Sequence, residues 1–272
     1  MIRLSLPLIA VVAFAACAPA ARTARPGQPA PIQITGAAST AEVDSLWARA
    51  DGLFRQAKWA DAATLLERLN LEYASGDPRI ARTRFELAEC YFGSSSHLQA
   101  AREFRRVSDD LPSDELAPEA LLRAGDVYAD LWQRPELDPT YAQTALQTYH
   151  ELQSRYPGTS AARRAVGRIA GLEDLLAFKQ YKAGLFYLKY KAYDSAIIYF
   201  KDLATGYPKA SSTPLALLRL IEIYRILGYQ EDLTETCGYA RKVFPGTAGL
   251  TEACTAPVVA PPTPAPPPAA HG

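Results

Sequence analysis

One phrase recurs along this sequence and constrains the fold more than any other feature. A small residue is followed at fixed spacings by a tyrosine, an alanine, an aromatic residue, an aliphatic residue and a proline. Two copies with identical spacing run from Ala88 to Pro112 and from Gly184 to Pro208. A third copy, from Gly125 to Pro157, carries eight extra residues in its middle.

This phrase predicts pairs of antiparallel helices. Small residues allow the two helices to approach closely, the aromatic residue fills the space beside the contact, and the proline ends the second helix. Such a hairpin cannot bury its apolar face alone, so hairpins stack into a solenoid. Weaker copies flank the clear three, and no segment alternates with the period of a strand. We therefore expect an all-α, tetratricopeptide-like solenoid of about five helical hairpins over residues 41–250.

Two regions depart from the minimal repeat. The third copy contains a proline-interrupted segment, Gln133 to Tyr141, which predicts a loop inside that hairpin. Before the fourth copy, Ser160 to about Lys191 has nearly continuous helical periodicity, which predicts one long helix.

The N-terminus resembles a secretory signal. An apolar run from Leu4 to Phe14 follows Arg3 and is too short to span a bilayer. The segment from Phe14 to Cys17 resembles a bacterial lipoprotein signal, in which the cysteine receives the lipid, including palmitate, and becomes the first mature residue. Residues 1–16 are then a signal peptide. The alternative is cleavage after small residues that leaves Cys17 a plain thiol.

Proline-rich segments flank the repeats on both sides. Residues 17–40 contain too few large apolar residues to fold and are expected to form a flexible tether. Residues 251–272 carry seven prolines between Pro257 and Pro268 and are expected to form a disordered tail.

Ala18 follows the cysteine of the lipoprotein signal, at the position where an aspartate would indicate retention in the inner membrane. The outer membrane is therefore favoured.

Of the three cysteines beyond Cys17, two lie near the end of the repeats. In an oxidising compartment Cys237 and Cys254 could form a disulfide, although their spacing permits this pairing without requiring it. Cys90 is expected to be a buried thiol.

The repeats are similar to those of the BamD-type outer-membrane assembly lipoproteins, a five-repeat tetratricopeptide family. The resemblance is strongest in Asp138 to Pro157 and in Ala177 to Gly228, and it covers about Ala41 to Thr247. It implies a non-enzymatic part of the machinery that inserts β-barrel proteins into the outer membrane. It also implies two partners: the POTRA domains of a BamA-type barrel protein at the C-terminal repeats, and the C-terminal signals of unfolded outer-membrane proteins at the N-terminal repeats.

Four aromatic residues in the first helices of the first two repeats are candidates for a peptide groove: Trp47, Phe54, Phe85 and Phe92. Such a groove would suit an extended peptide that ends in an aromatic residue. The alternative is that these rings pack between neighbouring repeats.

Four residues of the last two repeats are candidates for partner docking: Lys189, Lys191, Tyr199 and Arg225. Many relatives carry a basic residue where this chain has Tyr199. A solvated charged face explains the basic residues equally well.

The sequence contains no recognisable motif for catalysis or for binding a cofactor or a metal. None of His97, His150 and His271 has metal-ligand spacing to a cysteine or another histidine, and no phosphate-binding loop or nucleophile elbow is present. Lys and Arg balance Asp and Glu at 29 each, which does not favour nucleic acid as a partner. Two alternative functions remain: a periplasmic coordinator of envelope constriction or polysaccharide export, and a cell-wall enzyme on a helical frame.

Overall fold

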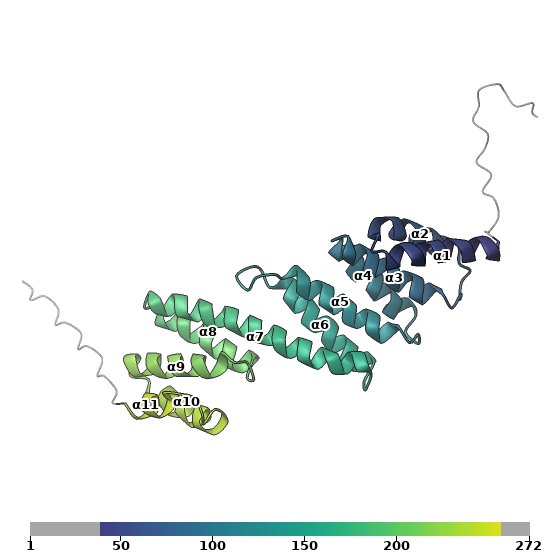
Figure 1. The fold of residues 1–272 in the computed structure, drawn as a ribbon. Coiled ribbons are helices and arrows are strands. Elements are labelled where there is room, and N and C mark those ends of the chain that lie inside the picture. The colour runs from purple at the N-terminus through teal and green to yellow at the C-terminus, as the bar shows by residue number, and fades with distance from the viewer. Residues whose placement is uncertain (1–38, 257–272) are drawn as a thin grey trace, which may run out of the picture. The chain divides into compact units, whose positions relative to one another are not determined.

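The computed structural model describes residues 39–256, and all regular secondary structure among these residues is helical (Figure 1). Consecutive helices pack against each other and form five hairpins and one short final helix. The hairpins pair α1 (Thr40–Arg55) with α2 (Trp59–Glu72), α3 (Ile80–Gly93) with α4 (His97–Asp110), α5 (Ala117–Leu131) with α6 (Thr140–Arg155), α7 (Ser160–Lys189) with α8 (Tyr193–Gly206), and α9 (Thr213–Leu227) with α10 (Gln230–Val243). The final helix is α11 (Leu250–Thr255). The predicted all-α solenoid of five hairpins is confirmed.

The contact between small and aromatic residues holds the hairpins together as the sequence predicts. A Cβ atom added to Gly125 would lie 2.4 Å from the ring of Tyr149, and one added to Gly184 would lie 2.5 Å from the ring of Phe200. Both rings are almost fully buried. A side chain at either glycine would therefore force the two helices apart.

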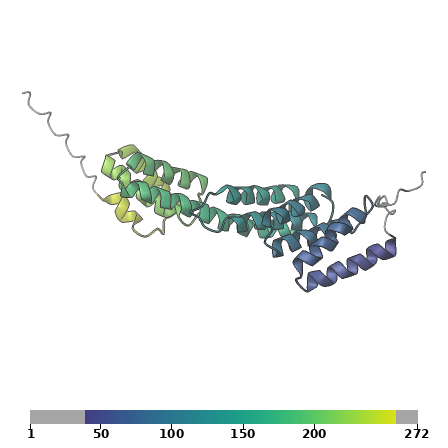
Figure 2. The same ribbon diagram turned by 90° about the horizontal axis from the view of Figure 1, so that it is seen from above.

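The apolar core continues from one hairpin to the next. Leu87 and Cys90 of α3 join the core of the first hairpin, and Ala120 and Ala124 of α5 join that of the second. Figure 2 shows each hairpin beside its neighbour in sequence. Each hairpin completes its apolar core with residues of a neighbouring hairpin, and the repeats must stack for this reason.

Both irregular regions lie where the sequence places them, except that Thr140 and Tyr141 of the predicted loop belong to α6. Residues 132–139 form the loop between α5 and α6, and α7 is a single helix of 30 residues. The ammonium group of Lys179, on α7, donates hydrogen bonds to the carbonyl oxygens of Pro135, Glu136 and Leu137, at 2.9, 3.3 and 2.9 Å. The long helix thus holds the inserted loop of the preceding repeat in place.

The C-terminal boundary differs from the prediction. The prediction that a disordered tail begins at residue 251 is wrong for residues 251–255, because these residues belong to α11. Leu250 is buried in the last core cluster, and Cys254 forms a disulfide with Cys237 of α10. These two attachments order the segment. At the other end, Ser39 caps α1, so Thr40 belongs to the first helix and not to the tether.

Within residues 39–256, no helix is both long enough and apolar enough to cross a membrane. The predicted signal peptide, Cys17, nearly all of the predicted tether and the proline-rich part of the predicted tail lie outside the described residues.

Candidate functional site

The four aromatic residues of the predicted groove are all half-buried, and each has a partner within the protein. Phe54 meets Trp59 edge-on at 5.5 Å between ring centroids, and Phe85 meets Phe104 at 5.2 Å. The remaining two rings lie under guanidinium groups: Trp47 under that of Arg82 at 5.7 Å, and Phe92 under that of Arg123 at 5.0 Å. Each ring therefore packs on one side and keeps an exposed part on the other.

The structure does not bring the four rings into one groove. Phe54 and Phe85 line a cavity of about 440 Å³ between α1, α3 and the segment that leads into α5. Phe92 lines a different cavity of about 390 Å³, and Trp47 lines neither of these two. We call the first of these the Glu86 cavity. Its lining residues are Phe54, Pro78, Arg79, Ala81, Arg82, Phe85, Glu86, Asp114, Glu115 and Leu116.

Glu86 is a site residue that sequence reasoning missed. Its side chain is buried, and its Oε1 accepts a hydrogen bond from Nε of Arg82 at 2.8 Å. Its Oε2 is also buried and has no hydrogen-bond partner among the described residues. Burial raises the pKa of the Glu86 carboxyl group. The available signal was the glutamate itself, beside Leu87 and Ala88 on the face of α3 that the repeat phrase marks as buried.

The second cavity contains an ion-pair network that joins three repeats. Arg123 donates to both carboxylate oxygens of Glu89, at 2.7 Å each. Asp126 accepts a hydrogen bond from the hydroxyl group of Tyr149 at 2.8 Å and pairs with Nε of Arg168 at 3.1 Å. These groups satisfy each other and link α3, α5, α6 and α7.

The docking candidates of the last two repeats lie on two hairpins. Lys189 and Lys191 are exposed at the turn between α7 and α8, without an ion pair to another described residue. Tyr199 stacks on Tyr187 with ring centroids 5.1 Å apart. Arg225 is half-buried on α9, and no described contact joins it to the other three.

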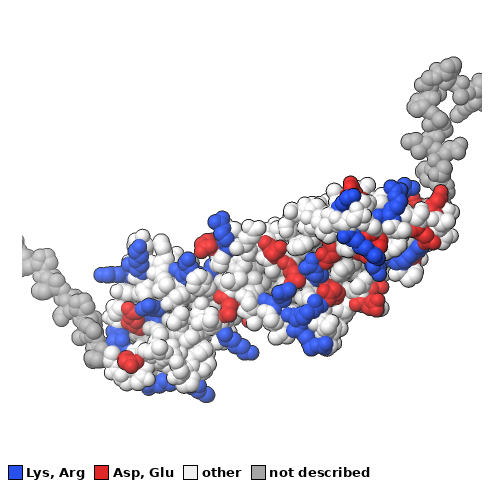
Figure 3. Space-filling model, in the orientation of Figure 1, with Lys and Arg blue, Asp and Glu red and all other residues white. Residues whose placement is uncertain are grey.

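The second half of α7 and the turn after it are rich in basic and aromatic residues. Residues 175–193 contain four lysines and neither Asp nor Glu. The exposed rings of Phe186 and Tyr190 lie beside Lys189 on α7 and the turn after it. On the visible face of the C-terminal hairpins, Lys and Arg side chains project among Asp and Glu side chains (Figure 3).

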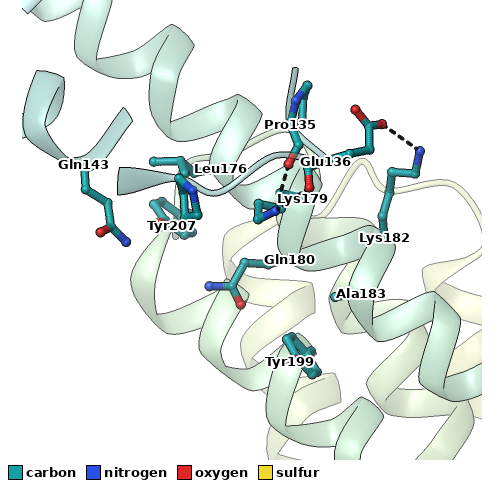
Figure 4. Close-up of a pocket in the computed structure, with 11 residues that line it drawn as sticks. Pro135, Glu136, Gln143, Leu176, Lys179, Gln180, Lys182, Ala183, Tyr199 and Tyr207 are labelled. Atoms are coloured by element: carbon teal, nitrogen blue, oxygen red, sulfur yellow. Dashed lines mark hydrogen bonds and ion pairs between the residues drawn. The ribbon is translucent and has the colours of Figure 1, made fainter. Parts of the chain in front are cut away.

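Tyr199 also lines a cavity of about 480 Å³ where the inserted loop meets α7 and α8. Pro135 and Glu136 border it on the loop side, Leu176 and Ala183 on α7, and Tyr207 after α8 (Figure 4). The two tyrosines give this cavity aromatic walls. Lys179, which sequence reasoning missed, forms part of its wall.

Among the described residues, no group of three or more His, Cys, Asp and Glu could hold a metal ion.

Known proteins match most of this stack of hairpins. A model of the YfiO family, described as an outer membrane lipoprotein, matches residues 40–237. The outer membrane protein assembly factor BamD of Caulobacter vibrioides is 32% identical over 116 residues, which are 43% of this chain and only 38% of that protein. The protein of the same name from Vibrio cholerae is 23% identical over 201 residues, which are 70% of this chain and 83% of that protein.

Solved structures of tetratricopeptide proteins are also similar. A thermophilic protein of Thermus thermophilus is 17% identical with a TM-score of 0.34, and the match covers 78% of this chain and 96% of that one. The TPR2AB domain of yeast Sti1 is 10% identical with a TM-score of 0.40, and the match covers 79% of this chain and 83% of that one. These scores are too low to support an argument about function. The family model, in contrast, covers all five hairpins except the last turns of α10, and the chain therefore belongs to the YfiO family of outer membrane lipoproteins.

Proposed function

We propose that this protein is a non-enzymatic, lipid-anchored scaffold of the machinery that assembles β-barrel proteins in the outer membrane. The observation that carries the proposal is the match of the family model to residues 40–237, the stack of hairpins itself. Both curated relatives bear the name of an outer membrane protein assembly factor, which agrees with this role.

The anchor is a lipid on Cys17, which holds the protein at the periplasmic face of the outer membrane. The segment from Phe14 to Cys17 supports this assignment, as does the proline-containing tether that follows. A lipid chain together with a tether leaves the repeats free to meet partners near the membrane surface.

The C-terminal hairpins bind the POTRA domains of a BamA-type barrel protein. Support comes from the exposed Lys189 and Lys191, from the cavity beside Tyr199 and from Arg225 on the next hairpin. An apolar centre with a charged rim is the usual composition of a protein–protein interface. The N-terminal hairpins receive segments of unfolded outer-membrane proteins, and the half-exposed rings of Phe54 and Phe85 support this second role.

Purification from the native envelope in mild detergent tests the proposal. A POTRA-bearing β-barrel protein should be recovered in near-equal amount. The double variant Lys189→Glu, Lys191→Glu should lower its recovery at least about fivefold, because each substitution reverses a charge at the docking surface. Lys58→Glu is the control for one such charge reversal, because Lys58 is an exposed lysine in the corresponding turn of the first hairpin. Recovery of division or polysaccharide-export proteins without such a barrel would refute the proposal.

A further inference from the structure

The Glu86 cavity has aromatic walls and an uneven balance of charge. Phe54 of α1 and Phe85 of α3 face it as half-exposed rings, and Leu116 adds an apolar side chain from the segment before α5. Its volume of about 440 Å³ is large enough for one long side chain and a stretch of main chain.

The two basic residues of the cavity already have partners. Arg79 donates from Nε and Nη2 to the carboxylate of Asp77, at 3.0 and 2.8 Å, and from Nη1 to Asp44 at 2.8 Å. Arg82 donates to Oε1 of Glu86. The cations of the cavity wall are therefore engaged within the fold.

The acidic residues of the cavity are less well compensated. Asp114 and Glu115 form no ion pair with another described residue, although Oδ1 of Asp114 accepts the amide hydrogen of Leu116. Glu86 is 6% exposed, and its Oε2 lacks a partner within the described part of the chain. A buried carboxylate oxygen without a donor is costly, and native proteins rarely leave one empty without a reason.

We infer that the Glu86 cavity binds a basic side chain, lysine or arginine, of an extended polypeptide segment. The charged head lies near Asp114 and Glu115 and donates to the free oxygen of Glu86, which a rotamer change of the Glu86 side chain brings to the cavity. The apolar stem passes between the rings of Phe54 and Phe85. A cation is favoured over a neutral donor such as a backbone amide. An amide would satisfy the oxygen of Glu86 but would leave the surplus negative charge of the cavity uncompensated. The aromatic rings suit the apolar stem of such a side chain, whose charged head extends beyond them.

This inference rests on the proposed role of the N-terminal hairpins in receiving polypeptide segments, and it names the side chain that enters. It differs from the expectation drawn from the sequence, in which the groove takes an aromatic terminal residue. In the inferred arrangement, the aromatic end of the segment lies outside the Glu86 cavity and a basic residue lies within it.

Peptide titration with the full-length protein in detergent tests the inference. The probes are nine-residue extended peptides that end in phenylalanine, with one lysine placed at each internal position in turn. A parallel set carries norleucine at the same positions, which keeps the apolar stem and removes the charge. At low salt, the best lysine peptide should bind at least about tenfold more tightly than its norleucine counterpart, the size expected for one charge-assisted contact.

Two variants connect the binding to the cavity. Glu86→Gln should weaken the lysine peptide about tenfold and leave the norleucine peptide unchanged. Glu103→Gln is the matched control and should change neither peptide. Glu103 pairs with Arg106 on its own helix and has a side chain 12% exposed, against 8% for Glu86. If Glu86→Gln does not fold, the exposed Glu115→Gln should still weaken the lysine peptide about threefold.

The outcomes separate the inference from the function on which it rests. Equal binding of the lysine and norleucine peptides would overturn the inference and leave the peptide-receiving role intact. Absence of binding by every peptide would overturn both. Preference for lysine that survives Glu86→Gln and Glu115→Gln would also overturn the inference, because the basic residue would then bind elsewhere.

Discussion

Single residues decide how closely the helices of a hairpin approach. Gly125 and Gly184 occupy equivalent positions in two repeats, and each lies directly against an aromatic ring of the partner helix. Ala88 takes this position in the second repeat, where Ala88 and Phe104 are fully buried in the same core. The repeated phrase thus reflects a steric requirement within each hairpin: a small residue must face the aromatic ring of the partner helix.

Gly184→Ala should destabilise the protein, because the new methyl group would lie 2.5 Å from the fully buried ring of Phe200. Overpacking of this kind costs about 1–3 kcal/mol and outweighs the gain in helix propensity of about 1 kcal/mol. Gly171→Ala is the control in the same helix, because nothing lies within 4 Å of the added atom. It should stabilise the protein by about 0.5–1 kcal/mol. Urea denaturation of both variants measures the difference, and the same sign for both would contradict the argument.

Glu86→Gln should raise the stability of the free protein at neutral pH, because burial disfavours the charged carboxylate and glutamine carries no charge. The folded-state pKa of Glu86 is raised above its ordinary value by burial. The unfolded chain therefore loses its proton at lower pH, and the wild-type protein loses stability as pH rises from the ordinary pKa through the raised one. Below the ordinary pKa the two proteins should be equally stable, because both side chains are neutral. Thermal melts over a pH series that begins well below the ordinary pKa of a glutamate and continues to neutral pH test this, and an advantage that did not grow with pH would refute it.

At the scale of elements, the end of the solenoid depends on a short helix that cannot stand alone. Six residues are too few for a helix to be stable in isolation. Helix α11 is held by the buried side chain of Leu250 and by the disulfide between Cys237 and Cys254. Its contacts reach both α9 and α10, so it covers the last hairpin as a cap.

Cys254→Ala should release α11 and lower the stability of the last hairpin. The disulfide closes a loop with a sequence separation of 17, and removing such a cross-link costs about 3 kcal/mol in the chain-entropy model. Thermal melts with and without reductant measure the effect. Reductant should destabilise the wild type and have no further effect on the variant. Equal sensitivity of both proteins to reductant would show that the disulfide is not the cause.

At the scale of the whole molecule, the described part of the chain is a linear series of contacts. Each helix packs against its neighbours in sequence, and the core passes from hairpin to hairpin. Ion pairs such as that between Arg123 and Glu89 join adjacent repeats. Stability in such a protein is close to a sum of repeat and interface contributions, so a local change has a local effect.

Hydrogen exchange should show this locality directly. In Cys254→Ala, amide exchange should accelerate in α9 to α11 and remain at the wild-type rate in α1 to α4. Mass spectrometry of peptic fragments resolves the two regions. Uniform acceleration along the chain would contradict the linear arrangement and indicate a single cooperative unit.

Much of this architecture could be predicted because its causes are local. The repeat phrase, the prolines that follow the helices and the periodicity of residues 160–191 placed the hairpins, the inserted loop and the long helix. Each of these features depends on residues a few positions apart, where helix geometry links spacing to contact. Family membership followed from the same order of repeats.

The sequence by itself therefore determined the helical solenoid, but the chemistry of its cavities was decided only by tertiary structure. Trp47, Phe54, Phe85 and Phe92 share a spacing pattern, yet only Phe54 and Phe85 line the same cavity. Likewise, the pairing of Arg79 with Asp44 joins residues 35 positions apart. Whether a charge is free or satisfied depends on such distant contacts, and spacing along one helix does not contain that information.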